Sequence, residues 1–200
     1  MHELYTIEKY MGTKGASNRQ RIIEAADRLF HTRGYNQTSF SDISEVTGIP
    51  RGNFYYYFKT KDDILNAVVD DRLSAYREML AGCEHQTDDP RQRLLSFVGF
   101  LDSNAEGIIQ SGCPIGSLTS ELTKDEPELQ LKSREVFDLL RDWLAKQLDM
   151  LGQENSSERA LDILARMQGV SVIACAYKNR EYLQRNITEL KSWINAFTSN

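Results

Sequence analysis

The chain has 200 residues, enough for one large domain or for a small domain joined to a larger one, and it contains no run of 18 apolar residues. Its formal net charge of −5 is unevenly divided, because residues 1–61 hold nine Lys/Arg against six Asp/Glu (net +3) whereas residues 62–200 hold fifteen against twenty-three (net −8). Only the N-terminal part is therefore expected to attract a polyanion such as nucleic acid.

The start of the chain and its cysteines exclude several classes of protein. Residues 1–11 lack the basic start, apolar stretch and cleavage site of a secretory signal. The cysteines are an odd number without paired spacing, which disfavours a disulfide framework or a Cys-rich zinc site: Cys83, Cys113 and Cys175. We expect a cytoplasmic protein with no membrane association, no metal and free thiols.

The N-terminal part predicts three short helices. Residues 17–33 have apolar side chains at three- and four-residue spacings, with Ser17 or Asn18 able to cap the start and Gly34 to end the helix. A second helix is expected over residues 41–47. A turn at Gly48-Ile49-Pro50 then leads into a third helix over about residues 51–58. This spacing is typical of a helix-turn-helix.

The remainder also predicts helices. A fourth helix begins around residues 60–62 and continues for about five turns to Leu80, and Pro90 and Pro127 each open another. We expect residues 111–122 to form a polar, glycine-containing link. The last two helices, at about 157–177 and 187–197, include the small residues Ala160, Ala165, Gly169, Ala174 and Ala176. Small residues permit close helix approach, so we expect these two helices to pair in a homodimer.

These elements predict an all-α protein in three parts. We expect a flexible arm at residues 1–16, a helix-turn-helix domain at 17–61, and a C-terminal helical domain for ligand binding and dimerisation at 62–200.

The segment from Thr38 to Asp62, TSFSDISEVTGIPRGNFYYYFKTKD, closely resembles the DNA-binding signature of the TetR family of bacterial regulators. The resemblance covers residues 17–65 without a gap and includes Arg33-Gly34-Tyr35, whereas the C-terminal two thirds resemble the family in helical layout and length. It implies a homodimer that binds double-stranded operator DNA. It also implies that Thr38 and Ser39 bind phosphates from the start of the second helix.

The third helix supports the same interpretation on physical grounds. Phe54 and Phe58 lie four residues apart and are expected to pack in the three-helix core. The partners expected for them are Leu29, Phe30, Ile43, Val46 and Ile49. The polar and aromatic residues around the other faces then remain for DNA.

We assign these remaining residues distinct roles. Arg51 at the helix start can fork onto guanine, Gly52 permits close backbone approach, and Tyr55 can cover thymine methyl groups, with Asn53 beside them. Phosphate contacts are expected from Tyr56, Tyr57 and Lys61. The alternatives are that the tyrosines are partly buried packing residues and that Arg51 and Lys61 form an ordinary solvated face.

The C-terminal part contains aromatic and sulfur-containing side chains that are candidates to line a ligand cavity, although core packing is the favoured interpretation of each one taken singly. They are Phe97, Phe100, Cys113, Phe137, Trp143, Met167 and Tyr177. Cys113 lies between Gly112 and Pro114, in a segment similar to that of some TetR-family regulators that sense reactive compounds. Two interpretations of this thiol stay open: a reactive sensor and a packing residue.

The favoured function is a repressor released from a palindromic operator by a small-molecule inducer. The alternatives are a thiol-based electrophile or redox sensor that uses Cys113, and a ligand-free architectural DNA-binding protein. Catalytic residues and cofactors are not expected, because the histidines are far apart in sequence and the chain has no phosphate-binding glycine loop or nucleophile elbow. The sequence does not identify the inducer, the operator, the target genes or the sign of regulation.

Overall fold

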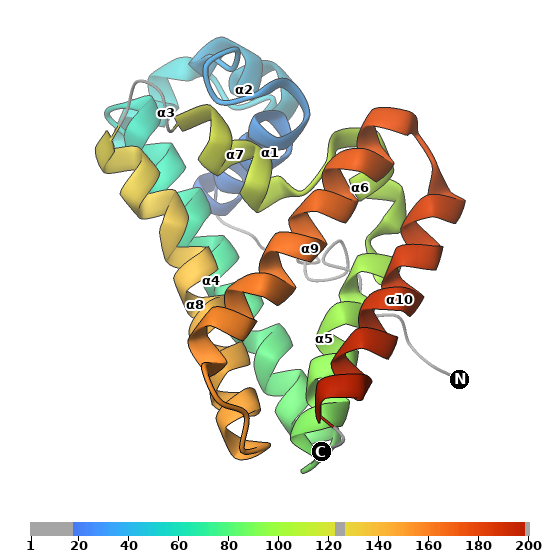
Figure 1. The fold of residues 1–200 in the computed structure, drawn as a ribbon. Coiled ribbons are helices and arrows are strands. Elements are labelled where there is room, and N and C mark those ends of the chain that lie inside the picture. Colours follow the sequence, from blue (N-terminus) through green and yellow to red (C-terminus); the bar gives the residue numbers. More distant parts are fainter. Residues whose placement is uncertain (1–17, 123–126, 199–200) are drawn as a thin grey trace. The chain divides into compact units, whose positions relative to one another are not determined.

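The computed structural model describes residues 18–122 and 127–198, which form α-helices joined by short loops and contain no strand (Figure 1). The all-α prediction is confirmed. In chain order the helices are α1 (Asn18–Arg33), α2 (Phe40–Thr47), α3 (Arg51–Tyr57), α4 (Lys61–Gln86), α5 (Pro90–Ser103), α6 (Ala105–Ser111), α7 (Pro114–Leu122), α8 (Pro127–Met150), α9 (Ser156–Tyr177) and α10 (Arg180–Thr198). The arm expected at residues 1–16 and the capping candidate Ser17 lie outside the described residues.

The helices form two compact units, and each unit is made of separate stretches of the chain. Their described residues are 18–75, 114–122 and 127–136 in the N-terminal unit, and 76–113 and 137–198 in the C-terminal unit. Helices α4 and α8 each contribute to both. Helix α7 thus belongs to the same unit as the predicted helix-turn-helix, although it comes much later in the chain.

Local signals in the sequence set the bounds of the first helices. Gly34 has φ 93° and its N–H donates to the Phe30 carbonyl at 3.1 Å, which ends α1. Helix α2 begins at Phe40, slightly earlier than expected, because Ser39 caps it: the Ser39 hydroxyl accepts from the Asp42 N–H while the Asp42 carboxylate accepts from the Ser39 N–H. This reciprocal capping box fixes the start of α2.

The segment at residues 111–122 is not the link that the sequence predicts. It is mostly helix α7, whose buried residues Ile115, Leu118 and Leu122 recur at helical spacing after a proline in the first turn. Gly112, with φ 78°, separates α7 from α6. The short length of both helices and the glycines around them hid this periodicity.

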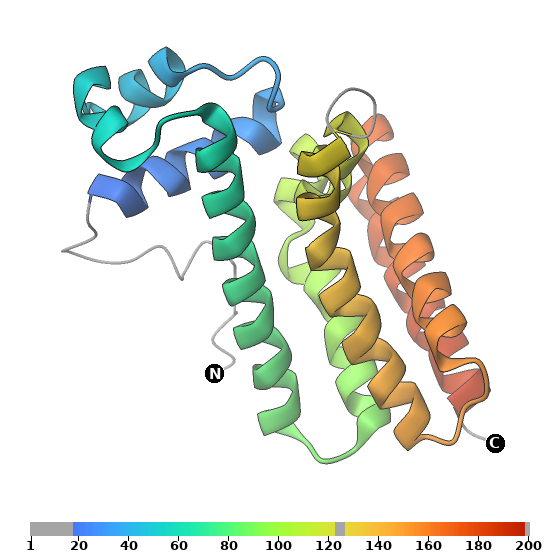
Figure 2. The same ribbon diagram turned by 90° about the vertical axis from the view of Figure 1, so that its left-hand side faces the viewer.

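In the C-terminal unit, α10 packs against both α5 and α9 (Figures 1 and 2). Helix α10 begins at Arg180 rather than Ile187, because Leu183 opens an apolar stripe that continues through Ile187, Leu190 and Ile194, all buried. Helix α9 is also long and apolar enough to meet a length-and-composition test for a membrane span. One of its faces, which includes Ala160, Ile163 and Ala174, is nevertheless buried in the unit.

Candidate nucleic-acid interface

Helix α3 is anchored by two phenylalanines. Phe54 is fully buried and Phe58, which follows the helix, is nearly so. The predicted partners Leu29, Phe30, Ile43 and Ile49 are buried as well, whereas Val46 is half exposed, so its predicted place in this core is wrong. Val46 lies three residues after Ile43 on the short helix α2, and Ile43 is the residue of α2 that is buried. The remaining core is sufficient to fix α3.

The turn between α2 and α3 is closed by short-range hydrogen bonds. Gly48 adopts the left-handed conformation (φ 66°), and its N–H donates to the Ser44 carbonyl at 2.9 Å. The Ser44 hydroxyl donates to the Ile49 carbonyl at 2.7 Å. Arg21 of α1 donates to the Thr47 carbonyl at 2.6 Å, which satisfies a carbonyl at the end of α2. The orientation of α3 relative to α2 is thereby set.

The exposed face of α3 is polar and aromatic. Arg51, Gly52 and Asn53 in its first turn are exposed, and Tyr55, Tyr56 and Tyr57 are 49%, 87% and 38% exposed. The alternative that the tyrosines are buried packing residues fits Tyr56 least. A Cβ added at Gly52 would meet nothing within 4 Å, so the fold itself leaves room for a side chain there.

All three tyrosines of α3 contact a neighbouring aromatic ring. Tyr55 stacks on Phe40 of α2, with ring centroids 5.9 Å apart and planes 17° apart, and Tyr56 and Tyr57 meet edge to face at 5.8 Å. The Lys59 ammonium donates to the Tyr55 carbonyl. These contacts restrict the rotamers of exposed rings and so reduce the entropy that a partner would have to remove.

The start of α2 presents Ser39 but not Thr38. Ser39 is exposed, whereas Thr38 is buried and its hydroxyl donates to the Gly34 carbonyl at 2.7 Å. The structure thus gives Thr38 a supporting contact within the α1–α2 loop. Hydrogen bonding to the side chain and N–H of Ser39 lowers the pKa of Asp42 below its usual value. The carboxylate form of Asp42 therefore favours the folded α2.

Lys61, at the start of α4, is partly engaged within the chain. Its ammonium donates to the Tyr35 carbonyl at 2.9 Å and lies 4.1 Å from the centre of the Tyr35 ring. The Tyr35 hydroxyl donates to the neighbouring Asp62 carboxylate. An internal role for Lys61 was not foreseen, because Tyr35 is 26 residues away in sequence. Lys61 as a whole is half-buried, so part of the residue still faces solvent.

The candidate ligand residues of the C-terminal unit differ widely in burial. Phe97 and Trp143 are buried, with ring centroids 5.8 Å apart, and Met167 is buried too. Phe100, Cys113 and Phe137 are half-buried. Tyr177 is 76% exposed at the end of α9, so it does not lie in the core with the others.

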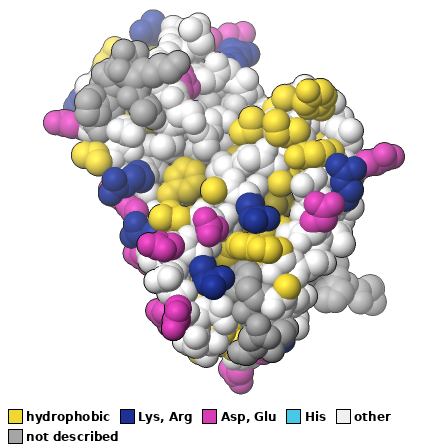
Figure 3. Space-filling view, viewed as in Figure 1, with side chains coloured by type: hydrophobic (Ala, Val, Ile, Leu, Met, Phe, Trp, Pro, Cys, Tyr) yellow, Lys and Arg dark blue, Asp and Glu magenta, His cyan; other side chains and the backbone are white. Residues whose placement is uncertain are grey.

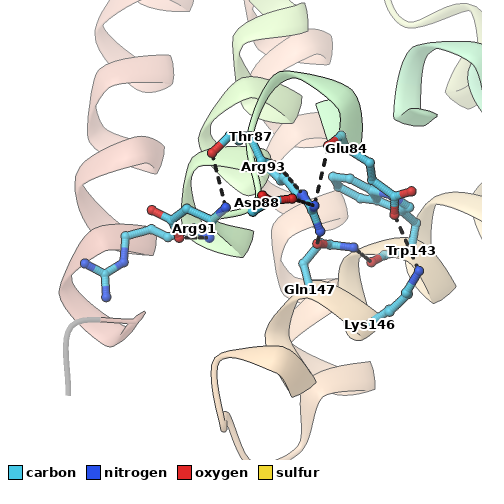
Figure 4. Close-up of polar contacts among 9 residues, drawn as sticks. Glu84, Thr87, Asp88, Arg91, Arg93, Trp143, Lys146 and Gln147 are labelled. Atoms are coloured by element: carbon cyan, nitrogen blue, oxygen red, sulfur yellow. Dashed lines mark hydrogen bonds and ion pairs between the residues drawn. The ribbon is translucent and has the colours of Figure 1, made fainter. Parts of the chain in front are cut away.

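A partly buried polar cluster joins α5 to its neighbours in this unit (Figure 4). The Arg93 guanidinium donates to the Thr87 carbonyl (2.8 Å), the Gln147 side chain (3.3 Å) and the Glu84 carbonyl (3.4 Å). The Trp143 indole N–H donates to the Glu84 carboxylate at 3.0 Å. Sequence periodicity gave no signal for this cluster, because its members come from α4, α5, α8 and the α4–α5 loop.

The thiols lie in different surroundings. Burial raises the pKa of the Cys83 thiol to about 11, and the nearby Glu84 adds to the shift, so Cys83 stays protonated at neutral pH. The Cys113 sulfur accepts a hydrogen bond from the neutral Gln168 amide at 3.3 Å.

An apolar stripe follows the outer face of α9. Leu161, Val172 and Tyr177 are 52%, 59% and 76% exposed, and the small residues Ala165, Gly169 and Ala176 are exposed between and beside them. Hydrophobic side chains gather on the face over α9 in Figure 3. Ala160 and Ala174, which the sequence also suggested for helix pairing, are instead fully buried inside the chain. The exposed face of α10 is mostly polar.

Comparison with known proteins is consistent across both units. Residues 22–68 match the family described as bacterial regulatory proteins, tetR family, and residues 90–189 match the LmrA/YxaF-like transcriptional regulator C-terminal domain. An uncharacterised HTH-type transcriptional regulator from the lacX 3' region of Lactococcus lactis subsp. lactis is 26% identical over 88% of this chain and 92% of its own. The HTH-type transcriptional repressor DhaR of Mycobacterium sp. (strain GP1) is 26% identical over 85% and 88%.

Solved structures agree with these matches. A TetR transcriptional regulator from Legionella pneumophila superposes with a TM-score of 0.81 at 22% identity, covering 92% of this chain and 99% of that one. Because the C-terminal match alone spans half of the chain and the N-terminal match adds the helix-turn-helix, this protein belongs to the TetR family of helix-turn-helix transcriptional regulators.

Proposed function

We propose that the chain is a cytoplasmic, non-catalytic repressor that binds a palindromic operator as a homodimer and releases it when a small molecule binds the C-terminal unit. The observation that carries this proposal is the exposed face of α3. Arg51, Asn53, Tyr55 and Tyr56 are exposed on a helix that Phe54 and Phe58 anchor to a buried core. The repressor DhaR offers a full-length relative for the sign of regulation.

The side chains of α3 suit the edges of bases in the major groove. Arg51 supplies a planar fork for the guanine O6 and N7 acceptors, and the Tyr55 ring, held against Phe40, supplies an apolar surface for a thymine methyl group. Gly52 lets the backbone approach closely, since the fold does not need the space at this position. Direct sequence discrimination is therefore assigned to Arg51 and Tyr55.

Phosphate contacts are assigned to the edges of this surface. Ser39, at the start of α2, and Tyr56 and Tyr57, in the last turn of α3, are exposed, and Lys61, at the start of α4, is half-buried. Such contacts fix register and orientation but carry no sequence information. Thr38 is assigned a supporting role instead, because its hydroxyl is buried on the Gly34 carbonyl.

The stripe on α9 is the proposed dimer interface. Small residues such as Ala165 and Gly169 permit close helix approach, and pairing two copies would bury Leu161 and Val172. A two-fold axis would then present two copies of α3 to half-sites about one DNA turn (~34 Å) or somewhat more apart. This symmetry is the reason to expect a near-palindromic operator.

The C-terminal unit is the proposed inducer-binding part, with Phe97, Phe100, Phe137, Trp143 and Met167 as candidate contacts. The alternative that Cys113 acts as a thiol sensor is not favoured, because the contact found for its sulfur is with the neutral Gln168 amide. The ligand-free architectural alternative leaves the separate C-terminal unit unused.

Selection from random DNA tests this function directly. Full-length protein is incubated with a pool of random duplexes, and bound duplexes are recovered and sequenced through successive rounds. We expect a near-palindrome, bound by two chains. Enrichment of no sequence, or of a motif without two-fold symmetry, would contradict the proposal.

A further inference from the structure

Helix α7 carries a carboxylate that binds the loop between α1 and α2. In the last turn of α7, Glu121 Oε2 accepts the Tyr35 backbone N–H at 2.8 Å and Oε1 accepts the Asn36 backbone N–H at 2.8 Å. Both oxygens are thus used on two consecutive amides, 86 and 85 residues earlier in the chain. Hydrogen bonds to an ionised acceptor are stronger than those between neutral groups. A carboxylate in the last turn of a helix opposes the helix dipole, so its gain comes from these amides.

The receiving loop is shaped for this carboxylate. A Cβ at Gly34 would lie only 3.0 Å from Glu121 Oε2, and the Gly34 φ of 93° is one that other residues rarely adopt. On its other side the loop is held at the Tyr35 carbonyl, which accepts the Lys61 ammonium at 2.9 Å. The Tyr35 backbone is therefore held by α7 through its N–H and by α4 through its carbonyl.

The first residue of α7 is attached to the same unit. Arg72 of α4 is buried, and its Nη1 donates to the Pro114 carbonyl at 2.8 Å while its Nε donates to the Asp27 carboxylate of α1 at 2.6 Å. Both ends of this nine-residue helix are thus joined to α1, α4 or the loop between α1 and α2. The helix functions as a brace for the helix-turn-helix rather than as a free connection.

We propose that Glu121 is a positioning residue for DNA binding. By holding the Tyr35 and Asn36 amides it keeps the α1–α2 loop, and with it Ser39 at the start of α2 and Lys61 at the start of α4, where these groups meet phosphates. The proposal rests on the proposed function.

The test compares Glu121→Gln with a charge-matched control, Glu78→Gln, which removes an exposed carboxylate from α4. The glutamine keeps the size of the side chain but places an NH₂ opposite one N–H donor. In the free protein we expect the Tyr35 and Asn36 amides to exchange with solvent at least tenfold faster in Glu121→Gln alone. For the duplex selected by the wild type we expect about tenfold weaker binding, with a salt slope flattened by at most about one unit, because Lys61 is the phosphate-binding cation whose position depends on this loop.

A second variant separates geometry from charge and guards against unfolding. Glu121→Asp keeps the charge but shortens the reach, so we expect it to weaken DNA binding as well. Wild-type exchange at Tyr35 and Asn36 in Glu121→Gln, DNA binding no weaker than in the control, or wild-type behaviour of Glu121→Asp would each overturn the proposal. If the wild-type protein selected no duplex, the proposed function would fail and take the positioning role with it, whereas a failure confined to the Glu121 variants would remove only the positioning role.

Discussion

The two units expose different chemistry to their surroundings. In the N-terminal unit, arginine and tyrosine side chains are exposed on a short anchored helix that lies within residues 1–61, the part of the sequence with a net charge of +3. The C-terminal unit, in a net negative part, shows an apolar stripe on α9 and keeps its large aromatic residues Phe97 and Trp143 inside. The first surface suits a polyanion and the second suits another copy of itself. The difference explains why a protein of net charge −5 can bind DNA: the charge relevant to binding is local.

The largest expected effect is a loss of stability on α3, where one side chain anchors the helix and a nearby one is exposed for DNA. Phe54→Ala removes a fully buried ring and should destabilise the N-terminal unit by about 3–5 kcal/mol. Tyr56→Ala, two residues away and 87% exposed, should change stability by less than about 0.5 kcal/mol while weakening DNA binding. Denaturant unfolding measures the free energy of unfolding of both variants. Similar losses of stability in the two variants would contradict the division between anchor and contact.

The dimer stripe should be the most sensitive surface of the C-terminal unit. Val172→Asp places a carboxylate in the proposed interface and should weaken dimerisation by about 3 kcal/mol, or more than a hundredfold in Kd. Gln92→Asp, exposed on α5 and outside the two helices expected to pair, is the control that adds the same charge. Sedimentation equilibrium measures the monomer–dimer balance. A Val172→Asp protein as dimeric as the control would move the interface elsewhere.

Within the N-terminal unit, substitutions of base-contacting and of phosphate-contacting residues should change DNA binding in different ways. Arg51→Ala should lose about 1–3 kcal/mol of preference for the selected duplex over a scrambled one. Lys61→Ala should instead weaken both duplexes and flatten the salt slope by about one unit, or by less to the extent that its bond to Tyr35 is kept. Titrations at several salt concentrations distinguish these classes. A change of base preference in Lys61→Ala with an unchanged slope would reverse the two assignments.

Acid should weaken the helix starts of the N-terminal unit. The N–H groups of Thr60 and Lys59 lower the pKa of Asp63 at the start of α4, as Ser39 lowers that of Asp42 in α2. With both pKa values depressed in the folded state, this stabilisation is complete above the ordinary value of 3.8 and is lost as the pH falls through the lower folded values. Asp63→Asn, which keeps an acceptor but cannot titrate, should have a flatter dependence of Tm on pH between about 5 and 2. An unchanged slope would show that this cap carries no acid sensitivity.

The success of prediction from sequence differs between local and long-range features of the fold for a physical reason. Helix starts and stops such as Gly34 and Gly48, and the buried spacing of Phe54 and Phe58, are local, so the helix-turn-helix follows from neighbouring residues. The contacts of Glu121 with Tyr35 and of Arg93 with Gln147 join residues 86 and 54 positions apart, and no spacing rule reveals them. Helix α7 was missed for the same reason: it is short, and its burial depends on a distant α1.

Exposure was harder to predict than helicity. Val46, Ala160 and Ala174 each carry an apolar side chain at a helical position, but Val46 turns outward while the two alanines are fully buried. Which side of a helix meets solvent depends on all its neighbours, and the sequence presents only those nearby.

Repeating the DNA selection with Arg51→Ala tests the central claim most directly. If α3 of each chain in a symmetric dimer reads one half-site, the variant should enrich the same palindrome with the same spacing but lose base preference at one position in each half, the two positions being related by the two-fold axis. A motif identical to that of the wild type, or a loss in one half only, would contradict the assignment of α3 as the reading element of a symmetric dimer.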